Sequence, residues 1–120
     1  MLFEREHGII IACDVFSIQK FEELVEKTCH IEGVVGYKVG AILGLTYGLK
    51  KLTSIIKEHC HLPTIYDHQK AGTDIPQMAG NFAKACSNAG IKGFIIFPQA
   101  GPETEKAFIA ATLKENMVPL

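Results

Sequence analysis

The chain has 120 residues, of which 48% are hydrophobic and 21% are charged, and its formal net charge at pH 7 is −1. This length and composition are typical of one globular domain with a real core, and they argue against a disordered or low-complexity chain. A net charge so close to zero gives no sign of a surface that binds nucleic acid or an anionic membrane.

No apolar stretch approaches membrane-spanning length, and the apolar run after the charged N-terminus is too short for a signal peptide. The four cysteines are scattered and form no C-x-x-C pair, which is typical of free thiols in a reducing compartment. We therefore expect a soluble protein of the cytoplasm.

Apolar runs and helical patterns alternate along the first half of the chain. Residues 8–14 (GIIIACD) predict a strand buried on both faces, followed by a helix that Ser17 caps. Residues 33–40 (GVVGYKVG) predict a second strand, and a helical pattern then continues to residue 59 with a break near Gly44 or Gly48. The third strand begins near residue 62 and ends in a cluster of polar residues.

The second half continues the alternation. Thr73 or Asp74 can cap a helix that carries Pro76 in its first turn, runs to about residue 88 and stops at Gly90. The strand, helix and strand expected after it cover residues 92–97, 102–116 and 117–120.

The regular alternation of strand and helix requires parallel strands joined by right-handed crossovers. An open doubly wound sheet and a (β/α)8 TIM barrel are the two candidates. No G-x-G-x-x-G follows the first strand, and polar residues stand at the ends of several strands, which favours the barrel.

A complete barrel needs about 200 residues or more. We therefore predict that residues 1–120 form a single domain, the N-terminal half of a (β/α)8 barrel, with four βα units and the start of strand five. We interpret the chain as the front part of a longer protein, and the alternative is a half-barrel that completes itself by association.

Charged residues stand at or near the ends of three predicted strands. Asp14 ends the first, Lys38 lies within the second, and Asp67 ends the third, closely followed by Lys70 and Asp74. Because the carboxyl ends of parallel strands meet at one edge, we expect these side chains to converge on one rim. A salt-bridge network without function is the alternative. Lys38 favours a functional site, since an unpaired buried ammonium would lose its proton or unfold the strand.

Other polar residues carry weaker signals. His68 can contact a substrate or orient its neighbours, or it is only a polar loop residue. The run His59, Cys60, His61 resembles a metal cluster, but adjacent residues at a helix end point in different directions and no second ligand pair follows. We expect no metal site there.

Three motifs, IIIACDV, GYKVG and DHQKAGTDIP, resemble those of the orotidine 5′-phosphate decarboxylase family, in the first half of its barrel. The resemblance implies decarboxylation of orotidine 5′-monophosphate to UMP and CO2 in pyrimidine biosynthesis, with no cofactor and no metal. It also implies a nucleotide substrate and a homodimer with shared active sites. The acid–lysine–acid spacing here, D-x-x-K-x-x-x-D, is two residues longer than the family's D-x-K-x-x-D.

The resemblance also implies a role for each residue. Asp14 and Lys38 would bind ribose hydroxyls, and Asp67 would lie against the substrate carboxylate. Lys70 would donate the proton to C6, and Asp74 would reach into the partner's site. We add His68 and Thr73 as further substrate-binding candidates.

Two other function classes stay open. One is a Mg²⁺-dependent sugar-phosphate decarboxylase or aldolase of the same superfamily, of the keto-gulonate-phosphate decarboxylase or hexulose-phosphate synthase type. These enzymes hold the ion partly with an acid on strand two, where this chain has Lys38. The other is a non-catalytic half-barrel that binds a partner or a nucleotide.

Overall fold

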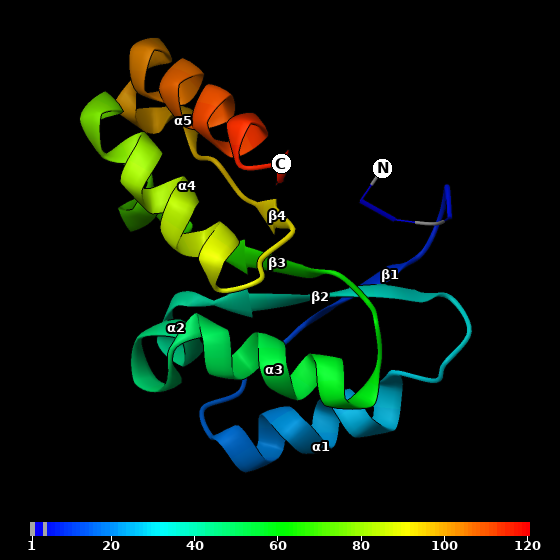
Figure 1. Ribbon diagram of the computed structural model, residues 1–120. Helices are drawn as coiled ribbons and strands as arrows, with labels where there is room; N and C mark the ends of the chain where they lie inside the picture. Colours follow the sequence, from blue (N-terminus) through cyan, green and yellow to red (C-terminus); the bar gives the residue numbers. More distant parts are fainter. Residues whose placement is uncertain (1, 4) are drawn as a thin grey trace.

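The computed structural model describes residues 2–3 and 5–120, without the side chains of residues 70 and 71. Its strands form one parallel sheet in the order β1-β2-β3-β4-β5, and a helix follows each of the first four strands (Figure 1). The strands are β1 (Ile9–Ala12), β2 (Val34–Gly40), β3 (Thr64–Asp67), β4 (Gly93–Phe94) and β5 (Val118–Pro119). The predicted α/β class is confirmed.

The helices are α1 (Ile18–Thr28), α2 (Ala41–Tyr47), α3 (Leu49–His59), α4 (Ala79–Asn88) and α5 (Pro102–Lys114), with short 3-10 turns η1 (Gln69–Gly72), η2 (Pro76–Met78) and η3 (Pro98–Ala100). Ser17 caps α1, since its Oγ accepts the Lys20 N–H at 3.3 Å. Gly48, at φ 81°, separates α2 from α3 as expected. Among the described residues no helix is long and apolar enough to cross a membrane.

One face of the sheet, which we call the helix face, packs against the helices. Tyr37 of β2 points to this face, where its hydroxyl lies 2.9 Å from the Thr28 hydroxyl of α1. The rings of Tyr66 and Phe94, from β3 and β4, pack against Phe82 of α4. The buried apolar side chains of strands and helices meet here in one continuous core.

The other face, which we call the open face, carries the residues that alternate with these along each strand. In β2 it presents Gly36 and Lys38. The N-terminal segment covers this face near the N-terminal ends of the strands. A Cβ atom on Gly36 would lie 3.1 Å from the Phe3 ring, and one on Gly93 would lie 3.0 Å from Leu2. None of the helix contacts described above lies on this face.

The expectation that the first strand is buried on both faces is wrong. Ile9 is 59% exposed and Ile10 is 41% exposed. The reason is topological, because β1 stands at the edge of the sheet and pairs only with β2. An apolar run can predict a strand, but its burial depends on neighbours that the run does not specify.

The segment before α4 also differs from the prediction. Neither Thr73 nor Asp74 caps the helix, and Pro76 opens η2 before α4 starts at Ala79. The Thr73 hydroxyl instead accepts the N–H of Phe97 at 3.2 Å. A side-chain oxygen that is engaged in this way is not available to a helix N-terminus.

The fourth strand is shorter than the predicted 92–97. β4 contains only Gly93 and Phe94, although the N–H groups of Ile95 and Ile96 still bond to β3 and to Leu120. The chain then leaves the sheet, because the Phe97 N–H turns to Thr73 and η3 begins at residue 98.

Candidate functional site

An ion pair joins β2 and β3 near their carboxyl ends. Lys38 Nζ donates a hydrogen bond to Asp67 Oδ2 at 3.0 Å. The side chains are 28% and 14% exposed, so the pair is mostly withdrawn from water. In the strand register, Asp67 stands opposite Gly40, which is two residues after Lys38. The lysine side chain therefore reaches diagonally across the two strands to the carboxylate.

Asp14 lies against Gly40, the residue that the register places opposite Asp67. A Cβ atom on Gly40 would lie 3.8 Å from Asp14 Oδ1 and 4.0 Å from the Asp67 carbonyl oxygen. Burial and, to a smaller extent, the Asp14 charge raise the pKa of the neighbouring Cys13 thiol to about 12, against a lowering effect of Lys38. The structure therefore brings Asp14, Lys38 and Asp67 to one rim at the carboxyl ends of β1, β2 and β3.

The turn after β3 is held from both sides of the sheet. On the open face, Asp67 Oδ1 accepts the N–H of Gln69 at 3.0 Å, and Gln69 adopts the left-handed region at φ 56°. One carboxylate thus binds Lys38 with one oxygen and the backbone of η1 with the other. This arrangement couples the turn directly to the ion pair.

On the helix face, His68 Nδ1 is hydrogen-bonded to the Tyr66 hydroxyl, and its ring lies edge-on to Phe82 at 5.4 Å between centroids. Burial raises the pKa of Tyr66 to about 12, and its hydroxyl shares one hydrogen bond with the imidazole. A Cβ atom on Gly72 would lie 2.7 Å from His68 Cβ, so the turn closes tightly over the histidine. His68 thereby anchors the turn, and its role toward a substrate stays a prediction.

The remaining candidates are Thr73, Asp74 and Lys70, which follow β3 in the sequence. Thr73 is 3% exposed and bonds to the backbone of Phe97. Asp74 is exposed, and its carbonyl oxygen accepts the Thr104 hydroxyl of α5 at 3.4 Å. Lys70 belongs to η1, directly after this strand end, but its side chain lies outside the described residues and its role stays a prediction.

Sequence reasoning missed Gly72, which makes room for the turn. A Cβ atom there would lie 2.7 Å from His68 Cβ, whereas one on Gly40 would lie at an ordinary contact distance of 3.8 Å from Asp14 Oδ1. A glycine shortly after the end of a strand is the only signal in the sequence, and it does not say which side chain lies against it. Among the described residues, no group of three or more His, Cys, Asp or Glu side chains is placed to hold a metal ion.

The model of the Orotidine 5′-phosphate decarboxylase / HUMPS family matches residues 8–118. The chain belongs to this family. The match covers all three motifs that carry the resemblance, from Asp14 to Asp74. A search of curated proteins found no match.

Solved structures of the family are similar in fold. The crystal structure of orotidine 5′-monophosphate decarboxylase from Methanocaldococcus jannaschii matches 94% of this chain with 26% identity and a TM-score of 0.79. Orotidine 5′-phosphate decarboxylase from Lactobacillus acidophilus matches 93% with 23% identity and a TM-score of 0.70, which shows the fold alone. The chain spans 52% and 47% of those two chains, about half of their length.

Proposed function

We propose that the full-length protein that contains this chain is a metal-free and cofactor-free orotidine 5′-phosphate decarboxylase. The observation that supports it most is the Lys38–Asp67 ion pair, with 3.0 Å between Nζ and Oδ2, at the carboxyl ends of parallel strands in a chain of this family. Ligands and chemistry concentrate at this end of such strands.

The reaction breaks the bond between C6 of the pyrimidine and its carboxylate, and CO2 leaves while the electron pair stays on C6. A nearby ammonium stabilises this charge and then supplies the proton, and we assign both tasks to Lys70. Asp67, which Lys38 and Gln69 hold in place, would face the substrate carboxylate. The site then stabilises the bound substrate less than it stabilises the transition state. Asp14 and Lys38 would bind the ribose hydroxyls.

We also propose a homodimer in which Asp74 completes the partner's site. Exposed apolar side chains stand in the segments that follow β1, β2 and β3, at the same end of the sheet as the ion pair. They are Phe16, Ile42, Leu45, Ile75 and Met78. Exposed apolar groups of this kind favour association. The four free thiols suit a reducing compartment, and we place the protein in the cytoplasm.

The family description also includes the HUMPS enzymes, so a Mg²⁺-dependent sugar-phosphate reaction is the second candidate. The donor set argues against it. Divalent ions of this kind prefer oxygen ligands, whereas β2 presents the Lys38 ammonium, which already occupies one oxygen of Asp67. A cation fixed at this place repels a second one.

The assay follows the loss of orotidine 5′-phosphate absorbance by the full-length gene product, with and without a chelator. We expect turnover that the chelator does not change. Lys70→Ala should lower kcat/KM by about a thousandfold, since it removes the proton donor. Lys84→Ala, an exposed lysine on α4, is the matched control and should leave turnover unchanged.

Each alternative has its own outcome. Full activity of Lys70→Ala contradicts the role of this lysine. Activity that is lost on chelation, together with turnover of a sugar phosphate, favours the Mg²⁺-dependent reaction. If neither substrate is turned over, the non-catalytic half-barrel is the better description.

A further inference from the structure

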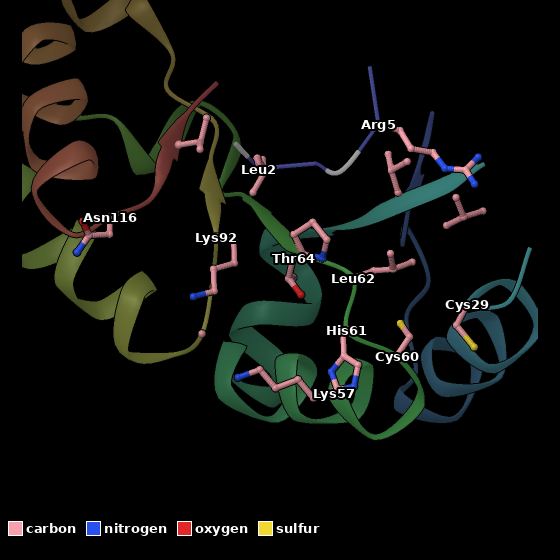
Figure 2. A pocket seen from close by; sticks show the side chains of 15 residues that line it. Leu2, Arg5, Cys29, Lys57, Cys60, His61, Leu62, Thr64, Lys92 and Asn116 are labelled. Atoms are coloured by element: carbon pink, nitrogen blue, oxygen red, sulfur yellow. The ribbon is translucent and has the colours of Figure 1, made fainter. Parts of the chain in front are cut away.

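A cavity lies at the opposite end of the sheet from the ion pair. Its volume is about 790 Å³, within the range of small-molecule sites. Val34, Thr64, Lys92 and Val118 line it, and they stand at the N-terminal ends of β2, β3, β4 and β5 (Figure 2). Leu2 of the N-terminal segment closes it on the open face. The proposed reaction leaves this cavity unused.

The charges around this cavity are of one sign. Arg5, Lys57 and Lys92 line it beside His61, and none of its described lining residues is Asp or Glu. They come from three parts of the chain, namely the N-terminal segment with Arg5, the end of α3 and the loop after it with Lys57 and His61, and the residue before β4 with Lys92, as Figure 2 shows. Arg5 pairs with Glu32 at 3.4 Å, whereas neither lysine has a described carboxylate within 4.0 Å. In a chain of net charge −1, this is a local excess of positive charge.

Helix ends explain only part of this excess. The carboxyl end of a helix attracts cations. Lys57 Nζ would lie 3.1 Å from a Cβ atom on Gly90, just beyond the end of α4, so part of its charge stabilises that end. This does not account for Lys92, which directly precedes β4, or for the lack of an acidic side chain among the described lining residues.

The rest of the lining is mostly apolar. Leu2, Val35, Leu62 and Pro63 form its walls, and the polar Asn116 stands at one end. Apolar walls with a few convergent polar groups are typical of sites for small organic ligands. A ligand that fits both the apolar walls and the cationic side chains has an apolar body and a group that carries more than one negative charge.

We propose that this cavity binds a small organic phosphate with an aromatic or otherwise apolar body. Lys57 and Lys92 hold the phosphate, His61 borders it, and the apolar walls receive the body of the ligand. The site is separate from the ion pair of Lys38 and Asp67, and it does not depend on the proposed decarboxylation.

Calorimetric titration of the chain with phenyl phosphate tests the proposal, and phenol is the uncharged control. We expect phenyl phosphate to bind more weakly as salt is added, and phenol to bind far less tightly. Lys57→Gln/Lys92→Gln should weaken phenyl phosphate binding by about tenfold or more, as expected for two charge-assisted hydrogen bonds. Lys50→Gln/Lys84→Gln makes the same charge change away from the cavity and should keep the affinity.

Binding of phenyl phosphate and decarboxylation are measured separately, so failure of this proposal and failure of the proposed function are distinguishable. Should the double variant unfold, His61→Gln and the salt dependence of the unchanged chain replace it. The proposal is overturned by undetectable binding at millimolar phenyl phosphate, by equal loss in both lysine pairs, or by equal binding of phenol.

Discussion

Lys38 lies in β2 among residues that are almost all buried, and it is tolerated there because Asp67 takes up its charge. Asp67 is in turn fixed by a second hydrogen bond, from the Gln69 N–H. Removing one member of a buried pair leaves the other charge without a partner, which costs more than the pair itself contributes. The two side chains should therefore behave as one unit.

We predict that Lys38→Met and Asp67→Asn each lower the free energy of unfolding by about 2 kcal/mol, between the values for exposed and for fully buried ion pairs. The double variant should lose clearly less free energy of unfolding than the two single variants lose together, because neither charge is then left unpaired. Urea unfolding of the four proteins measures this. Strictly additive losses would show that the two residues are not coupled.

The element that matters most for the site is the turn from β3 through η1. Asp67 fixes its start on the open face, and His68 packs against Tyr66 and Phe82 on the helix face. The turn carries Lys70, so its position sets where the proposed proton donor can reach. Gly72 closes the turn, and its lack of a side chain is what lets the backbone pass over the histidine.

Gly72→Ala should therefore lower the melting temperature and the activity of the full-length protein. The new Cβ would meet His68 Cβ at 2.7 Å, so the turn has to move, at a cost of about 1–3 kcal/mol. Gly80→Ala in α4 is the matched control, because a Cβ there meets nothing within 4 Å. It should raise the melting temperature slightly, as alanine favours helix. A Gly72→Ala protein as stable and active as the wild type would contradict this view of the turn.

At the scale of the whole molecule, the sheet is covered unevenly. The helices bury the helix face, while β1 remains an edge strand with Ile9 and Ile10 exposed. Leu120 is exposed beside the other edge strand, β5. Edge strands with exposed apolar side chains pair readily with another chain. The solved relatives of this family are about twice as long, so we propose that further strands cover these edges in the full-length protein.

The 120-residue chain on its own should consequently self-associate. We expect light scattering after size-exclusion chromatography to give a mass well above the 13.1 kDa monomer at micromolar concentration. Ile9→Lys/Ile10→Lys should shift the mass toward the monomer. Ile31→Lys, an exposed isoleucine outside the strands, should leave it unchanged. A monomeric wild-type chain would contradict the prediction.

The sequence alone determined the order of the elements and the residues at the rim. Local rules were sufficient for the Ser17 cap and the start of α5, and they narrowed the break between α2 and α3 to Gly44 or Gly48, since each depends on a few adjacent residues. The convergence of Asp14, Lys38 and Asp67 followed from one property of parallel sheets, namely that their carboxyl ends lie together.

Only the tertiary structure decided which side chains are buried and which way the polar ones turn. The runs of β1 and β2 look equally apolar, but β2 has two neighbouring strands and β1 has one. Thr73 looked like a helix cap, yet the chain brings Phe97 to its hydroxyl from 24 residues away. His68 packs edge-on against the ring of Phe82, which α4 brings to the helix face. Burial and pairing are made by residues distant in sequence, and no local pattern specifies them.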